Sequence, residues 1–498
     1  MLSVDQGTSG TRAIIINCDS GEIIAEHSVP LPNLFPQEGW VEISPRLILA
    51  TTLECIERTV AAAAESKGVT LDNIVGVGIT NQRETTLVWD SRTGEPLYNA
   101  IVWLDNRTNE TVKKLIDATP SKSAHHFQSV VGLPISPYFS AVKLRWLLDN
   151  VPEVSGDHVM FGTVDSWLIW NLTREGGSGP GTHVTDVTNA SRTMLMNLKT
   201  LQWDEEMCKF FGVNMGILPK IRSSAEVYGH ITTGVLAGKP IAGCLGDQQA
   251  ALFGQHCFER GEAKCTYGTG CFMLSNTGHE IVESSHGLLT TVAYKIGEER
   301  AVYALEGAVA IGGEVVRWLR DNLQIISTSS EIEKLCSSVD STHDLYFVPA
   351  FSGLYAPYWD PTARGLIIGI TAYTNRAHLA RAALEAVCFQ VSEILNAMDA
   401  DSGAPLVCLR SDGGMTKNRD FLGMQADTLG IPVECRAASA EATAMGAGMA
   451  AAKALGVWNV DKLPGEVVTF NPRVGEAERE GKMEKWKDAV QRCRGWTN

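Results

Sequence analysis

The chain has 498 residues, too many for one ordinary hydrophobic core, so we expect two domains of roughly 250 residues each. Hydrophobic residues make up 44% and charged residues 20%, a balance typical of folded globular proteins. The formal net charge of −15 argues against a protein that binds nucleic acid or anionic membranes, because such binding needs a surplus of lysine and arginine. We expect neither a transmembrane helix nor a secretory signal, since no apolar run reaches about 18 residues and no basic region precedes an apolar one at the start.

The 12 cysteines are scattered from Cys18 to Cys493 without a C-x-x-C pair. A zinc or redox motif is therefore unsupported. Buried free thiols in a reducing compartment are the favoured interpretation, and we expect the protein in the cytoplasm.

Two short apolar runs at the start of the chain flank a glycine-rich turn. Residues 2–4 lead into Asp5, residues 13–16 form the second run, and Gly7-Thr-Ser-Gly10 lies between them. Because glycine tolerates positive φ, this pattern predicts a β-hairpin. A similar pattern surrounds Gly268-Thr-Gly270, about half a chain later. The two turns suggest two related lobes that face each other.

Helical and strand patterns alternate between and after these turns. Residues 45–65 have helical composition, and residues 74–79 predict a buried strand. Apolar residues recur every three or four positions over 379–398, which predicts a long amphipathic helix, and residues 407–409 predict a strand that leads into Asp412-Gly-Gly414. The alternation predicts an α/β fold, with domains over residues 1–255 and 256–498.

Phosphate binding requires clustered backbone N–H donors and a metal to neutralise charge. The turn at residues 7–10 offers such donors together with the hydroxyls of Thr8 and Ser9, and Asp5 offers a carboxylate that could hold Mg²⁺. The alternative is an ordinary polar hairpin. The sequence contains neither a Walker A motif nor G-x-G-x-x-G, which disfavours a P-loop or Rossmann site.

Asp247 and Gln248 follow an apolar segment, where a strand is expected to end. A carboxylate at this place could accept a hydroxyl proton as a general base, or it could only cap the following helix.

Arg83 and Glu84 are adjacent and opposite in charge, which suits them to the hydroxyls of an uncharged polyol. The alternative is a surface ion pair of little energetic value. Trp103 and Phe272 could pack on the carbon chain of a ligand, although isolated aromatic residues usually belong to the core.

Several longer segments, taken in order, resemble the FGGY carbohydrate kinases, and within that family its glycerol kinases. The segments are GITNQRETT (78–86), FGTVDSW (161–167), TDVTNASRT (185–193), GDQQAAL (246–252), TYGTGCF (266–272) and APYWD (356–360), together with the signature regions that begin at YFSAVK (138–143) and GLIIG (365–369). So many matches in one order exclude chance agreement.

The resemblance implies an α/β fold with two actin-like ATPase domains of the ribonuclease H type, and an active site in the cleft between them. It implies ATP-dependent phosphorylation of glycerol to sn-glycerol 3-phosphate, with Mg²⁺ as cofactor, by a homo-oligomer (dimer or tetramer). The glycerol hydroxyls would contact Arg83, Glu84, Tyr138, Asp247 and Gln248, and the carbon chain would contact Trp103 and Phe272.

The resemblance also assigns the nucleotide side of the site. Thr8, Ser9, Gly10, Arg12 and Thr269 would surround the phosphates, and Gly313, Arg317, Gly414 and Asn418 would approach the adenine nucleotide. Asp5 would bind Mg²⁺, and Asp247 would be the catalytic base. Bacterial relatives usually carry serine where Gly10 stands and glutamine where Arg317 stands.

Two other functions are compatible with parts of the sequence. A sister kinase for another polyol or a ketose would need more hydrogen-bonding room than Trp103 and Phe272 leave. A non-catalytic, actin-like nucleotide switch would leave the pairs Arg83-Glu84 and Asp247-Gln248 unexplained.

Overall fold

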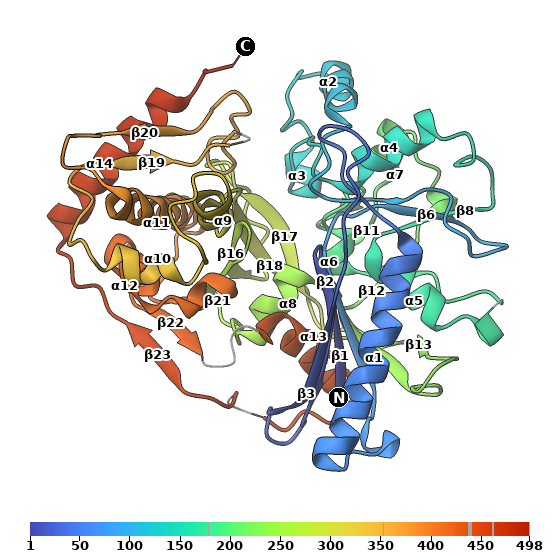
Figure 1. Cartoon of the computed structure of the whole chain (residues 1–498). Coiled ribbons are helices and arrows are strands. Elements are labelled where there is room, and N and C mark those ends of the chain that lie inside the picture. Colours follow the sequence, from blue (N-terminus) through green and yellow to red (C-terminus); the bar gives the residue numbers. More distant parts are fainter. Residues whose placement is uncertain (178, 352, 437–440, 461–462, 498) are drawn as a thin grey trace.

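The computed structural model describes residues 1–177, 179–351, 353–436, 441–460 and 463–497. The chain forms two α/β lobes side by side, one made mostly of the N-terminal half and the other mostly of the C-terminal half (Figure 1). The α/β architecture with two lobes, expected from the sequence, is confirmed. In the described part of the chain, no helix combines the length and the apolar character needed to cross a membrane.

The first lobe is built on a six-stranded sheet in the order β13-β14-β5-β1-β2-β3. β1, β2 and β3 form an antiparallel meander, β5 and β14 run parallel to β1, and β13 is antiparallel at the edge. The strands are β1 Leu2–Gln6, β2 Gly10–Ile16, β3 Ile23–Pro30, β5 Val77–Asn81, β13 Ala225–His230 and β14 Pro240–Gly246.

The second lobe repeats this pattern in a seven-stranded sheet, in the order β17-β18-β16-β15-β21-β22-β23. β18, β16 and β15 are antiparallel neighbours, and β21 and β22 run parallel to β15. The strands are β15 Ala263–Tyr267, β16 Cys271–Gly278, β17 Leu289–Tyr294, β18 Val302–Val309, β21 Leu409–Asp412, β22 Val433–Arg436 and β23 Val467–Phe470.

Both predicted hairpins are confirmed, as β1–β2 and β15–β16. The strand predicted at residues 74–79 is shifted, because Leu71–Asn73 forms a 3₁₀ turn and β5 runs instead from Val77 to Asn81. The shift matters for the site, since it places a polar residue, Asn81, at the buried end of a central strand.

Helices cover both faces of each sheet. In the first lobe, α1 (Pro45–Lys67) packs on one face and α13 (Ala442–Ala454) on the other, so that a late segment of the chain returns to the first sheet. In the second lobe, α8 (Asp247–Gly254) lies on the inner face, and α11 (Arg376–Ser402) and α12 (Arg419–Leu429) lie on the outer side. The helices predicted at residues 45–65 and 379–398 are α1 and α11.

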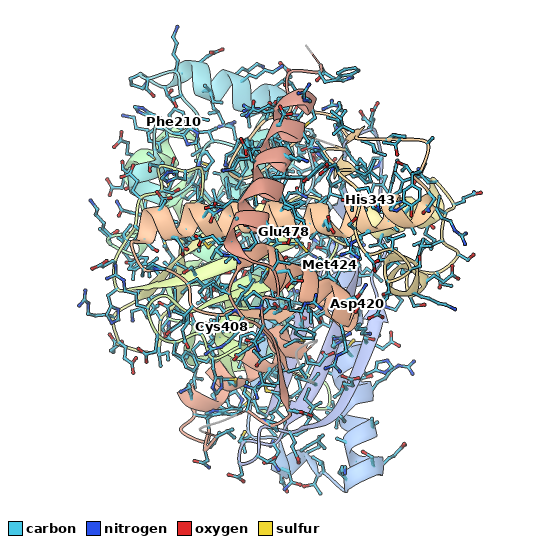
Figure 2. The ribbon with its side chains drawn as sticks, turned by 90° about the vertical axis from the view of Figure 1, so that its left-hand side faces the viewer. Phe210, His343, Cys408, Asp420, Met424 and Glu478 are labelled. Carbon is cyan, nitrogen blue, oxygen red and sulfur yellow. The ribbon has the colours of Figure 1, made fainter. Side chains whose placement is uncertain are left out.

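The outermost layer of the second lobe is α14 (Glu476–Cys493), which crosses α11 in Figure 2. Trp486 of α14 is fully buried there and stacks on Phe389 of α11, with ring centroids 5.3 Å apart and planes inclined by 23°. This aromatic pair fixes the C-terminal helix on the lobe.

The other elements lie in insertions between the sheet strands. In the first half they are β4 Glu42–Ile43, β6 Leu87–Asp90, β7 Ala100–Ile101, α2 Asn109–Ala118, α3 Gln128–Val131, α4 Ser140–Asn150, β8 Val159–Gly162, α5 Val164–Leu172, β9 Val184–Asp186, α6 Val187–Ala190, β10 Met196–Asn197, β11 Gln202–Trp203, α7 Glu205–Phe210 and β12 Lys220–Arg222. In the second half they are α9 Glu314–Asp321, α10 Glu331–Cys336, β19 Tyr346–Val348 and β20 Leu366–Ile368.

The edge of the second sheet docks on the insertion of the first lobe. The backbone N–H of Thr290 in β17 donates to the carbonyl of Gly132 at 3.0 Å, and the Tyr303 hydroxyl in β18 donates to the carbonyl of Leu198 at 2.7 Å. Ser191 and Thr291 share a hydrogen bond of 2.8 Å at the same joint. The lobes are therefore joined through a buried polar contact on β17 and β18.

Helices α8 and α13 cross between the two lobes at very close range. A Cβ atom on Gly446 would lie 1.8 Å from the carbonyl oxygen of Ala250, and a Cβ on Gly254 would lie 2.0 Å from that of Ala442. Real Cβ atoms do not approach backbone so closely, so the crossing requires glycine at both positions.

We predict that Gly446→Ala lowers the free energy of unfolding by about 1–3 kcal/mol or more, because the added methyl group forces α8 and α13 apart. Gly481→Ala is the matched control, since Gly481 is an exposed helical glycine of α14 with open space around its Cβ position. This control should gain roughly 0.5–1 kcal/mol from helix propensity. Thermal and denaturant unfolding of both variants measure these changes in the free energy of unfolding. A Gly446→Ala variant as stable as the wild type would contradict the packing argument.

Candidate active site

Three parallel strands of the first sheet end side by side. Gln6 of β1 is paired with Asn81 of β5, and Asn81 is paired with Gly246 of β14. The chain continues from these ends into the turn at residues 7–10, into Gln82-Arg83-Glu84 and into Asp247-Gln248. The register of the sheet thus delivers three sequence motifs to one edge, which is where open α/β sheets bind ligands.

Arg83 lies at the centre of a buried group of charges. Its side chain is 2% exposed, and its guanidinium reaches Asp247 at 3.1 Å and both oxygens of Glu306 at 2.5 and 2.9 Å. The hypothesis of a surface ion pair between Arg83 and Glu84 is therefore wrong: Arg83 is paired with other residues and is buried. Burial lowers the pKa of Arg83, but the charges of Glu306 and Glu84 outweigh that effect and hold this pKa above its usual value.

Glu84 is held in an unusual backbone conformation, with φ of 59°. A positive φ is costly for a residue with a Cβ atom, so the surroundings must hold it. Its carbonyl accepts hydrogen bonds from the hydroxyls of Thr86 and Ser140, and its carboxylate accepts one from Nε of Arg192 at 2.5 Å. Burial raises the pKa of Glu84, and Arg192 and Arg83 oppose that rise.

An aromatic group adjoins these charges. The Trp103 ring lies 5.6 Å from Tyr138 and 5.9 Å from Phe272, between centroids, and its Nε1 donates to the hydroxyl of Thr8 at 2.9 Å. Tyr138 and Trp103 come from the first lobe and Phe272 from β16 of the second. The structure thus brings together Trp103 and Phe272, the two rings expected to cover a carbon chain, and places Tyr138 beside them.

Asp247 is the first residue of α8, whereas the N-cap is Gly246. The interpretation of Asp247 as the helix cap is therefore not supported. Its side chain stays 27% exposed and is held by Arg83 and by the backbone N–H of Gln248 at 2.7 Å. Burial raises the pKa of Asp247 above its usual range, while Arg83 and Lys264 oppose the rise. A partly exposed carboxylate of raised pKa suits a general base.

Asp5 faces the same region from the end of β1. Burial and the nearby charge of Asp247 raise the pKa of Asp5 to about 7, against the opposing effect of Arg12. Two carboxylates that repel each other in this way form a donor set that fits a hard cation such as Mg²⁺.

The phosphate-binding candidates of the first lobe lie in and beside the turn after β1. Thr8 is half-buried under Trp103, Ser9 is exposed, and Gly10 is so close to the carbonyl of Val29 that a Cβ would lie 3.0 Å from it. Arg12 forms an ion pair with Glu441, at the start of α13. The guanidinium of Arg12 therefore already has a carboxylate partner, a constraint that the sequence did not reveal.

The second lobe repeats the arrangement of strand ends. Thr266 of β15 is paired with Asp412 of β21, and the chain continues into Gly268-Thr-Gly270 and into Gly413-Gly414. A cavity of about 410 Å³ lies at these ends. All five nucleotide candidates of this lobe line it: Thr269, Gly313, Arg317, Gly414 and Asn418.

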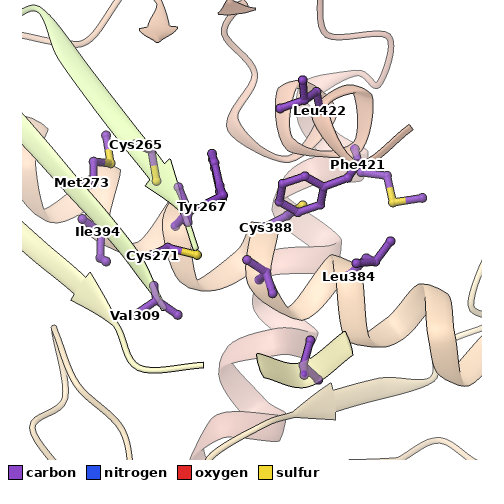
Figure 3. Close-up of a cluster of buried hydrophobic side chains, with 14 of the residues drawn as sticks. Cys265, Tyr267, Cys271, Met273, Val309, Leu384, Cys388, Ile394, Phe421 and Leu422 are labelled. Carbon is purple, nitrogen blue, oxygen red and sulfur yellow. The ribbon is translucent and has the colours of Figure 1, made fainter. Parts of the chain in front are cut away.

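The floor of this cavity is the edge of the hydrophobic core. Tyr267, Leu384 and Phe421 line the cavity and also belong to the buried cluster in Figure 3. The rings of Tyr267 and Phe421 meet edge to face at 5.1 Å. A Cβ on Gly313 would lie 2.8 Å from the carbonyl oxygen of Gly268, so the absence of a side chain there lets two loops close against each other.

Asn418 supplies a direct sign of a ligand. Its side-chain oxygen caps α12 by accepting from the N–H of Phe421 at 2.9 Å. Its buried Nδ2 has no hydrogen-bond partner among the residues that the structure describes. Because an unpaired buried donor is costly, a ligand with an acceptor atom, such as an adenine nucleotide, fits this cavity.

Sequence reasoning missed three charged residues of the site: Arg192, Lys264 and Glu306. Each is fully buried. A sign was available for two of them, because Glu306 and Lys264 each interrupt an apolar strand segment, VYALEGAV and AKCTY. A charge inside a buried strand must have partners, so it marks a site.

Two sheets of one topology, each with a glycine turn and polar side chains at the ends of its parallel strands, define a two-lobed phosphotransferase of the actin-like ATPase class. Comparisons with known proteins narrow this class. Residues 1–254 match the model of the N-terminal domain of the FGGY family of carbohydrate kinases, and residues 263–455 match that of the C-terminal domain. The chain belongs to this family and is a carbohydrate kinase.

Individual kinases of this family are similar to the chain over almost its whole length. A glycerol kinase of Brucella anthropi is 51% identical, over 99% of this chain and 98% of that protein. The crystal structure of a Plasmodium falciparum glycerol kinase with ADP superposes with a TM-score of 0.89 at 38% identity, over 99% of this chain and 97% of that one. A xylulose kinase of Lactobacillus acidophilus, at 22% identity and a TM-score of 0.83, covers 98% of this chain and 96% of its own, and shares the fold.

We predict that Asp5→Asn makes the protein more stable at about pH 8 in the presence of EDTA. A carboxyl group whose folded-state pKa is raised destabilises the fold as the pH rises above its ordinary value of 3.8, fully so above about 7. The asparagine removes that penalty, so the gain in melting temperature should shrink as the pH is lowered towards 4. Thermal unfolding of both proteins between pH 4 and pH 8 measures this gain in melting temperature. A variant that melts at or below the wild-type temperature at pH 8 would contradict a raised pKa of Asp5 in the folded protein.

Proposed function

We propose that this kinase transfers the γ-phosphoryl group of ATP to a terminal hydroxyl of glycerol, forming sn-glycerol 3-phosphate and ADP. The observation that carries the proposal is the single group formed by Arg83, Glu84, Asp247 and Gln248 beside Trp103, Tyr138 and Phe272. The charged and amide groups and the Tyr138 hydroxyl can exchange hydrogen bonds with three hydroxyls, while the rings of Trp103 and Phe272 cover a short carbon chain. The glycerol kinases among the relatives support the same substrate.

In the proposed mechanism, Asp247 accepts the proton of the attacking hydroxyl, and that oxygen forms a bond to the γ-phosphorus as the bond to ADP breaks. Arg83 and Glu84 orient the substrate, and Arg83 also fixes the direction of the Asp247 carboxylate. The turns at residues 7–10 and 268–270 offer N–H donors to the phosphates from both lobes. Asp5 would hold Mg²⁺, whose charge offsets that of the phosphates.

The same proposal places the enzyme in the cytoplasm and makes it a homo-oligomer. The burial of the cysteines supports the first point, because nine of the twelve lie in the interior of the structure, as expected for a protein of a reducing compartment. The N-terminal and C-terminal domains would comprise residues 1–255 and 256–498, with α13 packed against the first sheet as described.

A coupled assay of ADP release over a panel of polyols and sugars tests the substrate. Glycerol should give the highest kcat/KM, with pentuloses and hexoses far below. A preference for a ketose, or ATP hydrolysis that no polyol stimulates, would refute the proposal.

We predict that Asp247→Asn lowers kcat by roughly 10²–10⁴-fold, the usual effect of losing a general base. The amide keeps the shape of the side chain and leaves the nucleotide cavity untouched, so ADP should bind with almost unchanged affinity. Rapid-quench turnover and ADP titration measure the two effects. Near-normal turnover would show that Asp247 is not the base.

Arg83→Ala should raise the KM for glycerol far more than the KM for ATP, since a charged donor contributes roughly 1.5–3 kcal/mol to a hydrogen bond. It also leaves Glu306 without its main partner, so the melting temperature should fall. Steady-state kinetics with each substrate varied in turn, on protein shown to be folded by circular dichroism, gives the answer. Equal effects on both KM values would assign Arg83 a structural role only.

A further inference from the structure

Three residues of the second sheet form a row that faces the first lobe. Leu274 of β16 is paired with Lys264 of β15 on one side and with Glu306 of β18 on the other. Paired residues of neighbouring strands project from the same face of a sheet. Leu274 packs with Leu252 and Phe253 of α8, so this row faces the helix that begins with Asp247.

Glu306 links two arginines of the first lobe. Its side chain is fully buried and reaches Arg83 through both oxygens, at 2.5 and 2.9 Å, and Arg192 at 3.2 Å. Arg192 in turn holds Glu84, and Arg83 holds Asp247. The five charges alternate in sign along a chain in which Glu306 is the central member.

Lys264 plays a similar part at the other end of the row. Its fully buried Nζ donates to Oε1 of Gln248 at 2.5 Å, to the hydroxyl of Thr266 at 2.8 Å and to the carbonyl of Phe272 at 3.3 Å. It therefore contacts two residues of the proposed glycerol site at once. Its contact with Gln248 uses the amide oxygen and leaves the amide N–H groups for another acceptor.

We propose that Glu306 and Lys264 are positioning residues: the second lobe uses them to hold the glycerol-contacting side chains Arg83, Glu84 and Gln248 in their binding orientation. This inference rests on the proposed function. Neither residue reaches solvent, so neither touches the substrate itself. Glu306 fixes two nitrogens of the Arg83 guanidinium and thereby limits the directions in which its remaining N–H groups can donate. Both lobes thus build the glycerol site, although every hydroxyl-contacting residue belongs to the first half of the chain.

The test compares Glu306→Gln with a control on the same strand. Glu306→Gln keeps the shape of the side chain but removes the charge that orients two arginines. We expect the KM for glycerol, and its Kd by calorimetry without ATP, to rise on the order of 10- to 100-fold, with the KM for ATP changed less than about 2-fold. Tyr303→Phe removes a buried hydrogen bond between the lobes from β18 and leaves the charges intact, so it should lower the melting temperature without changing the KM for glycerol.

Two further variants separate positioning from a general loss of structure. Glu306→Asp retains the charge on a shorter side chain and should restore part of the affinity for glycerol. Lys264→Met should also raise the KM for glycerol selectively, and it carries the test if Glu306→Gln does not fold. Unchanged KM values in folded Glu306→Gln or Lys264→Met, or equal increases for glycerol and ATP, would overturn the inference. A wild-type enzyme that does not phosphorylate glycerol would instead refute the proposed function.

Discussion

Arg83 carries a full positive charge at a place where its side chain is 2% exposed, and the architecture around it follows from that constraint. A buried guanidinium is tolerated only with partners of opposite charge and good geometry. Asp247, the residue that follows β14, supplies one carboxylate, and Glu306 of β18 in the other lobe supplies the second. Glu306 also forms an ion pair with Arg192, and Arg192 forms a second ion pair with Glu84. Each of these buried charges requires a neighbour of opposite charge, so the strands and loops that supply them must come together. They come together near the contact between the two lobes at β17 and β18.

The strand ends explain why two distant parts of the sequence serve one reaction. In each lobe the parallel strands end in register. A glycine turn follows β1 in the first lobe and β15 in the second. The first lobe adds side chains with charged and hydroxyl groups, which recognise a small polar molecule through directional hydrogen bonds. The second lobe adds mostly backbone and a cavity above the hydrophobic core, which suits a large ligand with a flat apolar part and phosphates. One topology, used twice, gives two kinds of site.

Much of this could be predicted from the sequence, because the motifs at the strand ends are local. The turn at residues 7–10 and the hairpin around it, the long helix α11, and the gathering of Thr269, Gly313, Gly414 and Asn418 in one region all followed from short segments or from the family resemblance. The partners of Arg83 did not, since Glu306 lies more than two hundred positions away on another sheet and only the tertiary structure brings it close. Short segments also could not show that Arg12 is already paired with Glu441, which lies beyond the second sheet's parallel strands in the chain. Long-range charge pairing depends on the register of two sheets, and no local pattern records it.

The balance of charges in the buried group bears on the kind of substrate. All three carboxylates of this group, Glu84, Asp247 and Glu306, are already paired with Arg83 or Arg192 in the structure. Lys264 lies beside them and donates to Gln248, Thr266 and Phe272. A neutral polyol can enter such a site by exchanging hydrogen bonds, without changing the net charge of a region in which most of the charged side chains are buried. A substrate with its own carboxylate would add a further negative charge, and it would have to separate an existing ion pair to obtain a partner, at the cost of leaving another charge unpaired. The paired charges therefore favour a neutral substrate on electrostatic grounds alone. The aromatic side chains then restrict the size of that substrate.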